Sequence, residues 1–174
     1  EKAVQTTEER RKLQNSYNQD HDIVPKTIQK PIREKVVEIT DANVSGVIFA
    51  HGSRFGGHSL FIKDNKLYYV YNFLGIKPEQ QLISSTTLKP GKYTFGMEFT
   101  KEKAGEHGES IGTAKLFVND QEVAKGPMRA QVGKFTLVGD GLCVGFDSGD
   151  NVSQLYKSPG EFEGGTISFV TVNT

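Results

Sequence analysis

The sequence predicts an all-β fold, either a sandwich or a barrel. From Val36 onward, about ten short segments show the period-2 alternation of half-buried strands, and no segment shows a convincing helical pattern. Turn signals such as Pro90-Gly91 and Pro159-Gly160 separate these segments. The 19 glycines, 11 phenylalanines and absence of Trp are typical of many turns between aromatic-rich strands. The length of 174 residues suits one domain with a substantial core.

Residues 1–35 differ from the rest of the chain. The polar run from Thr7 to Asn15 has Thr6 or Thr7 as an N-cap and acidic residues in a first helical turn, but few apolar residues follow. We expect a short helix or loose arm there, which we interpret as a linker or arm remnant from a parent chain. The β-sandwich domain is then predicted to span residues 36–174.

The predicted strands follow from alternation and from turn chemistry. Residues 92–100 are the clearest case, because Tyr93, Phe95, Met97 and Phe99 share one face. Two-residue turns predict hairpins at Asp64-Asn65 and Asn119-Asp120, and the charged segment 101–110 is expected to be an exposed loop. The strands are expected near residues 36–40, 46–51, 58–63, 67–73, 80–84, 92–100, 114–118, 121–124, 134–138, 141–146 and 166–172.

The composition excludes several classes of function. Lys plus Arg and Asp plus Glu are both 21, so no net charge favours nucleic acid or an anionic membrane. A single cysteine excludes an internal disulfide and a cysteine-rich zinc site. No apolar run is long enough for a transmembrane segment.

Three motifs follow one another along the chain. Residues 46–73 combine Gly-Ser-Arg-Phe-Gly-Gly at 52–57 with Leu-Tyr-Tyr-Val-Tyr-Asn-Phe at 67–73. Gly-Leu-Cys-Val-Gly-Phe-Asp-Ser-Gly follows at 141–149, and Phe-Glu-Gly-Gly-Thr-Ile at 162–167. Together these motifs resemble the C-terminal domain of large bacterial arylsulfatases, over about Ser45 to Val172. The resemblance implies a two-sheet antiparallel jelly roll of the concanavalin A-like or laminin-G-like type.

The same resemblance implies a parent hydrolase of sulfuric esters that needs formylglycine and a divalent cation. The maturation motif Cys/Ser-x-Pro-x-Arg is missing, since Cys143 is followed by neither the Pro nor the Arg. We therefore expect no cofactor in this domain and no sulfatase activity from the chain alone. Cys143 is interpreted as a buried structural thiol, and Glu161 and Glu163 do not form the carboxylate set of a glycosidase.

Four residues are candidate ligand-binding positions. His51, Arg54 and His58 surround the glycine-rich turn, where two histidines across a hairpin suit a metal and Arg54 suits a sulfate or carboxylate. The structural alternative is a turn in which Gly52, Gly56 and Gly57 supply positive φ and a β-bulge, and in which Arg54 pairs with an acid on the neighbouring strand or the parent domain. Tyr68 is a candidate for stacking on a sugar, against the alternative of a core position.

Asp147 and Asp150 are weak calcium candidates in an oxygen-rich turn. Their spacing matches no dedicated calcium loop, and such residues are also common in turns for conformational reasons. No metal site is therefore assigned.

Two functions are open at this point. The first is a non-catalytic accessory domain that packs on the catalytic sulfatase domain of the same chain and assists binding of a sulfated or glycan substrate. The alternative is an independent carbohydrate-binding, lectin-like module. The first predicts an apolar patch that would let the isolated fragment form a homodimer. The family suggests a periplasmic or extracellular location.

Overall fold

A computed structural model describes residues 12, 16–21, 36–132 and 140–173. The chain divides into two compact units, Glu1–Arg33 and Glu34–Thr174. In the first unit, residues 16–20 are helical, and the N-caps predicted at Thr6 or Thr7 lie outside the described residues. The interpretation of this unit as a linker remnant stays a prediction.

The second unit consists of β-strands joined by turns and loops. The strands of its described part, in chain order, are β1 (Val37–Ile39), β2 (Gly46–Ser53), β3 (Gly56–Lys63), β4 (Lys66–Asn72), β5 (Gln80–Thr87), β6 (Gly91–Tyr93), β7 (Phe95–Ala104), β8 (Ser110–Val118), β9 (Gln121–Ala130), β10 (Asp140–Val144) and β11 (Gly165–Ile167).

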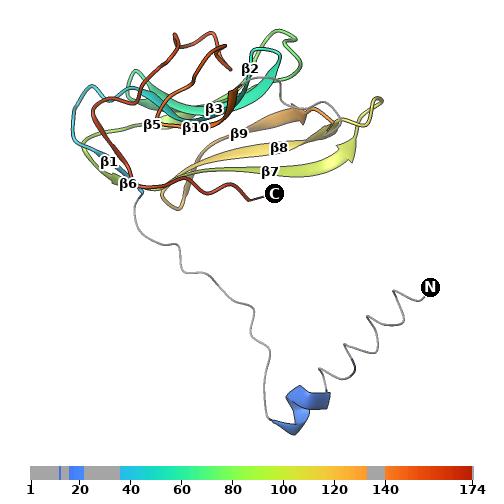
Figure 1. The fold of residues 1–174 in the computed structure, drawn as a ribbon. Coiled ribbons are helices and arrows are strands. Elements are labelled where there is room, and N and C mark those ends of the chain that lie inside the picture. The colour runs from blue at the N-terminus through green and yellow to red at the C-terminus, as the bar shows by residue number, and fades with distance from the viewer. Residues whose placement is uncertain (1–11, 13–15, 22–35, 133–139, 174) are drawn as a thin grey trace. The chain divides into compact units, whose positions relative to one another are not determined.

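These strands form three antiparallel sheets. One has five strands in the order β10-β2-β3-β4-β5, the second has the order β7-β8-β9, and the third, short sheet has the order β11-β1-β6. The first two sheets form the two layers of a sandwich (Figure 1). The predicted all-β sandwich is therefore confirmed, while the jelly-roll connection pattern stays a prediction.

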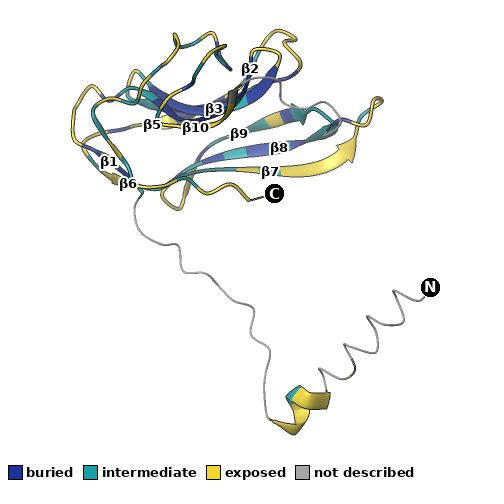
Figure 2. Cartoon of the chain, in the orientation of Figure 1, coloured by how far each residue is buried: buried dark blue, intermediate teal, exposed yellow. Residues whose placement is uncertain are grey.

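The core lies between the two larger sheets. Leu60 and Tyr69 of the five-stranded sheet and Leu116 of β8 belong to one buried cluster. Side chains on β8 alternate between buried and half-buried positions, as expected for a strand with one face on the core. The buried strands of the upper layer contrast with the exposed far end of β7 (Figure 2).

A second apolar cluster covers the outer face of the five-stranded sheet. Val47, Phe61 and Val70 pack there against Val152, and Tyr156 adds to the cluster. The segment after β10 supplies these last two residues and crosses over the sheet (Figure 1). Both faces of β2, β3 and β4 are covered. Their sequences therefore contain long stretches of buried residues instead of a strict alternation of buried and exposed ones.

Both predicted two-residue turns are present. Lys63 pairs with Lys66 across Asp64 and Asn65, which have φ of 50° and 56°. Positive φ at both central residues is the requirement of the turn that matches strand twist in a hairpin. In the same way, Val118 pairs with Gln121, and Asn119 has a φ of 54°.

The structure corrects several predicted boundaries. The predicted strand 92–100 is two strands, because Thr94 and Asn119 bond to each other and interrupt it between β6 and β7. The predicted loop 101–110 is partly wrong, since β7 continues to Ala104 and pairs with β8. Charged side chains on an exposed face misled the prediction, because such residues are compatible with the solvent side of a strand. The strand predicted at 134–138 lies outside the described residues.

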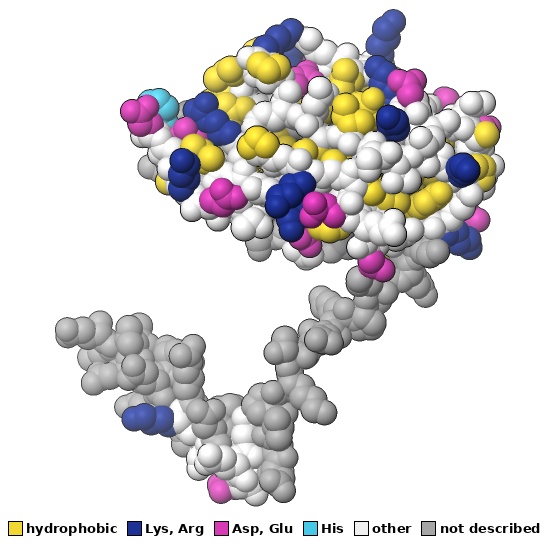
Figure 3. Space-filling model, turned by 180° about the vertical axis from the view of Figure 1, so that it is seen from behind, with side chains coloured by type: hydrophobic (Ala, Val, Ile, Leu, Met, Phe, Trp, Pro, Cys, Tyr) yellow, Lys and Arg dark blue, Asp and Glu magenta, His cyan; other side chains and the backbone are white. Residues whose placement is uncertain are grey.

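The surface of the sandwich carries scattered apolar side chains among charged ones (Figure 3). Leu142, Val144 and Phe146 are exposed at and just after β10. Among the residues that the structure describes, no helix is long and apolar enough to cross a bilayer.

Candidate functional site

The glycine-rich motif forms a tight hairpin between β2 and β3. Ser53 pairs with Gly56, so Arg54 and Phe55 occupy the two turn positions. Gly52 and Gly56 have φ of +94° and +152°, as the structural alternative predicts, but Gly57 does not have positive φ. The predicted bulge is not at the turn, because the register shift of this strand pair lies between Val47 and Phe49. The motif thereby presents Arg54 and Phe55 at the tip of the hairpin, where both side chains are exposed.

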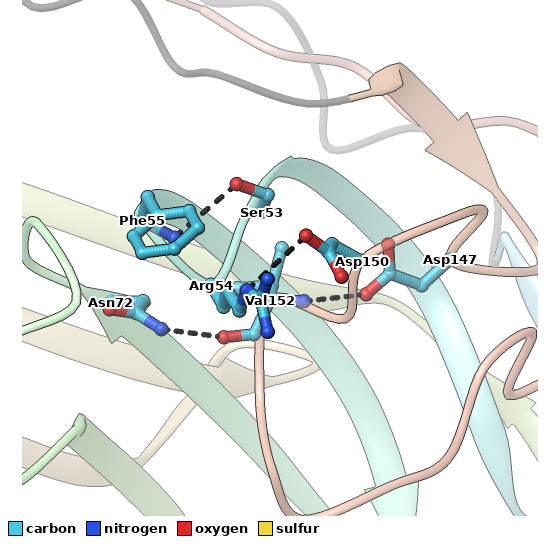
Figure 4. A network of polar contacts seen from close by, with 7 residues as sticks. All are labelled: Ser53, Arg54, Phe55, Asn72, Asp147, Asp150 and Val152. Atoms are coloured by element: carbon cyan, nitrogen blue, oxygen red, sulfur yellow. Dashed lines mark hydrogen bonds and ion pairs between the residues drawn. The ribbon is translucent and has the colours of Figure 1, made fainter.

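Arg54 pairs with an acid on a distant loop. Its Nε lies 3.3 Å from Oδ2 of Asp150, and its guanidinium group lies 4.8 Å from the centre of the Phe55 ring. Both members of the ion pair are more than half exposed, at 61% and 54% of their side-chain area. An ion pair this exposed contributes about 0–1 kcal/mol to stability. Figure 4 shows this ion pair between the hairpin tip and the loop.

Asp147, which lies on the same loop as Asp150, is buried and forms hydrogen bonds within that loop. Oδ2 of this buried carboxylate accepts hydrogen bonds from the backbone N–H of Val152 (2.9 Å) and from the hydroxyl of Tyr156. The Asn72 side chain donates to the carbonyl oxygen of Val152 at 3.0 Å, which ties the loop to β4 (Figure 4). Burial and the hydrogen bond to Asp147 raise the pKa of Tyr156 above its ordinary value. Asp147 thus stabilises the loop.

The two calcium candidates therefore have different surroundings. Asp147 holds the loop, and Asp150 faces Arg54. Within the described part of the chain, no three His, Cys, Asp or Glu side chains gather into a group that could hold a metal ion. Calcium binding at Asp147 and Asp150 stays a prediction.

A shallow pocket lies beside the hairpin tip. Arg54, Asn72 and Lys77 line it together with the apolar side chain of Ile76. Its polar groups have partners on the covering loop, the segment 145–164 between β10 and β11. Lys77 Nζ donates to Gln154 at 2.9 Å, and Glu79 accepts a hydrogen bond from the Ser153 hydroxyl at 2.7 Å. These contacts fasten the loop to the sheet.

A polar row crosses the opposite, inner face of the five-stranded sheet. In the strand register, His51, His58, Tyr71 and Gln80 lie side by side on β2, β3, β4 and β5, and the apolar Leu142 of β10 lies next to His51 at the end of this row. The two predicted histidines are therefore direct cross-strand neighbours, with ring centres 5.7 Å apart. The hairpin register set by the Gly52–Gly57 turn produces this pairing.

His58 lies within a cluster of aromatic rings. Nδ1 of His58 and Oη of Tyr69 form a hydrogen bond of 3.1 Å, and the Phe49 ring lies edge-on at 5.3 Å. Burial, and secondarily the neighbouring His51, lower the pKa of His58 to about 4. Burial raises the pKa of Tyr69, so both side chains are neutral at pH 7.

Tyr68 and Cys143 both contact neighbouring side chains of the sandwich. Tyr68 is half-buried on the outer face and stacks on Phe61, with ring centres 5.2 Å apart. Cys143 is half-buried rather than fully buried, and its Sγ lies 3.4 Å from the Ser148 hydroxyl oxygen. The core alternative thus describes Tyr68 well.

The sequence did not indicate the contacts that two tyrosines make in these networks. Tyr69 contacts His58, and Tyr156 contacts Asp147. The alternation in residues 67–73 marks Tyr69 as a core residue, but alternation cannot specify which polar group its hydroxyl meets. No local signal marks Tyr156, because its partner depends on the path of the covering loop.

The fold and these networks together define a β-sandwich with a loop-covered face and an aromatic–histidine row, without a recognisable catalytic constellation in its described part. The similarity to known proteins lies at the other end of the chain. The model of the family described as Ultra-violet resistance protein B matches residues 1–33. No solved structure matches the chain significantly.

Three relatives illustrate the extent of this similarity. UvrABC system protein B of Methanosarcina acetivorans is 70% identical over 40 residues, which are 23% of this chain and 6% of that protein. The protein of the same name from Methanococcus maripaludis is 65% identical over 40 residues, again 23% and 6%. That of Clostridium botulinum is 56% identical over 41 residues, 24% and 6%. The chain thus spans about 6% of the length of the curated relatives it matches.

These comparisons correct the predicted family. The chain is similar to UvrB proteins, so the predicted arylsulfatase domain is wrong, as are the sulfatase accessory function and the lectin-like alternative. The catalytic sulfatase partner, the sulfated or glycan substrate and the exclusion of nucleic acid are overturned by the same finding. The homodimer and the periplasmic or extracellular location depended on the sulfatase resemblance and are withdrawn with it.

Proposed function

We propose that the chain acts in a UvrABC system and that residues 1–33 are a DNA-binding segment within it. The observation that carries this proposal is the match of that segment to UvrB, with 70% identity over 40 residues to one such protein.

The charges of the segment support a nucleic acid partner. Residues 1–33 contain seven Lys or Arg and five Asp or Glu, although the whole chain has no net charge. Arg10, Arg11 and Lys12 are consecutive, and the described Lys12 is exposed. Clustered basic side chains gain affinity for phosphates through release of counterions.

An exposed aromatic pair accompanies the basic run. Tyr17 stacks on His21 with ring centres 4.0 Å apart, and Tyr17 is 53% exposed. A ring held in this way has an open face for a base, and base stacking on aromatic side chains contributes about 1–3 kcal/mol. The combination of basic and aromatic side chains suits DNA better than an uncharged partner.

The proposal is limited to binding. Because the chain spans about 6% of the curated relatives, we assign it no enzymatic step of their system. The β-sandwich is then a second unit on the same chain, available for contacts of its own.

DNA binding by the full chain tests the proposal. Fluorescence anisotropy with a labelled duplex carrying an ultraviolet photoproduct, and with the matching single strand, would be measured at two salt concentrations. The test variant is Arg10→Ala/Arg11→Ala/Lys12→Ala, and the matched control is Lys101→Ala/Lys103→Ala on the exposed end of β7. We expect salt-dependent binding that the first variant weakens at least tenfold and the second leaves unchanged.

Two results would contradict the proposal: absence of binding to either DNA, or equal losses in the two variants. Repeating the titration with the A component of a UvrABC system added shows whether a protein contact is needed. Binding to that component with no DNA contact would replace DNA by protein as the partner.

A further inference from the structure

Outside the UvrB-like segment, the chemically most distinctive cluster is the histidine pair on the inner face of the sandwich. His51 and His58 face each other across β2 and β3 in the middle of the polar row. Both side chains are half-buried. The neighbouring Leu142 on β10 is 52% exposed, which places this end of the row near solvent.

The spacing of the two rings suits a shared metal ion. With Zn–N bonds of about 2.0–2.1 Å and near-tetrahedral angles, two imidazole ring centres lie roughly 5–6 Å apart. The observed separation is 5.7 Å, with an angle of 65° between the ring planes. The observed separation of the two ring centres therefore falls within the range that a shared metal ion requires.

Tyr69 supplies the outer support that histidine ligands commonly have. Its hydroxyl oxygen lies 3.1 Å from Nδ1 of His58, which leaves Nε2 as the nitrogen available to a metal. In the metal-bound tautomer, Nδ1 carries the proton and donates it in a hydrogen bond to the Tyr69 oxygen. Such a second contact fixes the orientation of a ligating ring.

We infer that His51 and His58 form a two-histidine site for a divalent transition-metal ion, with Cu²⁺ or Zn²⁺ as the ions it suits. Imidazole ligands suit both ions, and the general order of affinities places Cu²⁺ above Zn²⁺. No third His, Cys, Asp or Glu joins the pair among the described residues, so water completes the coordination. The site differs in this respect from closed structural zinc sites, which have four protein ligands.

The test is isothermal titration calorimetry of the full chain, freed of metal beforehand, with Cu²⁺ in one experiment and Zn²⁺ in another. Electron paramagnetic resonance of the Cu²⁺ complex reports how many nitrogen atoms are bound. We expect one equivalent of Cu²⁺ bound through two imidazole nitrogens, more tightly than Zn²⁺. His51→Gln is expected to weaken Cu²⁺ binding at least tenfold, and Tyr69→Phe by about 10-fold or more through loss of the supporting hydrogen bond.

His107→Gln is the matched control, because His107 lies on an exposed turn away from the pair. Circular dichroism in metal-free buffer checks that each variant keeps the fold. His51→Gln removes one of the two proposed ligands, so it decides the question even if His58→Gln fails to fold. Equal Cu²⁺ affinity in wild type and His51→Gln, or failure of the wild type to bind Cu²⁺, would overturn the inference.

Discussion

At the scale of single residues, Asp147 and Asp150 show how position rather than residue type decides a role. The two carboxylates are three residues apart in one turn. Asp147 is 2% exposed and bonds to Val152 and Tyr156, whereas Asp150 forms an exposed ion pair with Arg54. A buried acceptor is costly to remove because its donors lose water as well as their partner.

We therefore predict that Asp147→Ala destabilises the sandwich far more than Asp150→Ala. Each buried donor left without an acceptor costs about 1–3 kcal/mol, whereas loss of an exposed ion pair costs about 0–1 kcal/mol. Urea denaturation of the two variants would measure both free energies of unfolding. Equal effects would show that the bonds of Asp147 do not hold the loop.

The ionisation of Glu109 makes the free energy of unfolding depend on pH in the acidic range. This side chain is only 5% exposed, its carboxylate accepts the backbone N–H of His107 at 2.9 Å, and Arg129 lies 3.0 Å away. The hydrogen bond from its own backbone N–H, followed by that from His107 and the charge of Arg129, holds the pKa of Glu109 below the ordinary value of 4.5, although burial opposes this effect.

Since the folded-state pKa of Glu109 is the lower one, the unfolded chain binds the proton more readily. The contribution of Glu109 to stability is thus present above about pH 4.5 and is lost as the pH falls through the folded-state pKa. We predict that Glu109→Gln is less stable than wild type at pH 7 and that the difference narrows below pH 4.5. Thermal melts across this range would test it, with exposed Glu106→Gln as the control.

At the scale of elements, the β2–β3 hairpin positions both networks described above. It carries Arg54 at its tip and the two histidines along its strands. Gly52 permits this geometry, because its φ is +94° and a Cβ there would lie 2.2 Å from the carbonyl oxygen of Gly56. Neither condition can be met by a residue with a side chain unless the hairpin moves.

We predict that Gly52→Ala destabilises the protein by about 1–3 kcal/mol or more, because both the backbone conformation and the close contact become unfavourable. The control is Gly141→Ala in β10, where an added Cβ meets nothing within 4 Å and the expected change is within about 0.5 kcal/mol. Chemical denaturation of both variants provides the measurement. A tolerated Gly52→Ala would mean that the turn can adopt another conformation.

At the scale of the whole molecule, the chain combines two units with different relationships to known proteins. Residues 1–33 match the UvrB family, and the sandwich occupies the second unit, Glu34–Thr174. The zero net charge of the whole chain conceals the basic excess of its first unit. For this reason, the sequence-based exclusion of nucleic acid was wrong: it used the net charge of the whole chain, although the chain consists of two units of different charge.

We predict that a fragment of residues 34–174 folds without the first unit. Among the described residues, the core contains members of the second unit only, so the melting temperature of the fragment should lie within about 2 °C of the sandwich transition in the full chain. The same fragment should lose DNA binding under the conditions of the anisotropy experiment. A fragment that fails to fold, measured by circular dichroism, would contradict the division into two units.

The amino-acid sequence alone determined the all-β class, most strand positions and both two-residue turns. These features depend on local rules, namely the alternation of side chains along a strand and the positive φ that turn residues such as Asp64, Asn65 and Asn119 tolerate. The similarity of residues 1–33 to UvrB could not be inferred in this way, because this segment has too few apolar positions to predict a structure.

The tertiary structure alone decided which side chains meet. Arg54 pairs with Asp150, and Tyr156 reaches Asp147 only because the loop after β10 folds back over the outer face of the sheet. His58 meets Tyr69 through the register of β3 and β4. Contacts of this kind depend on burial and on hydrogen bonds between segments distant in sequence, which local alternation and turn propensity do not specify.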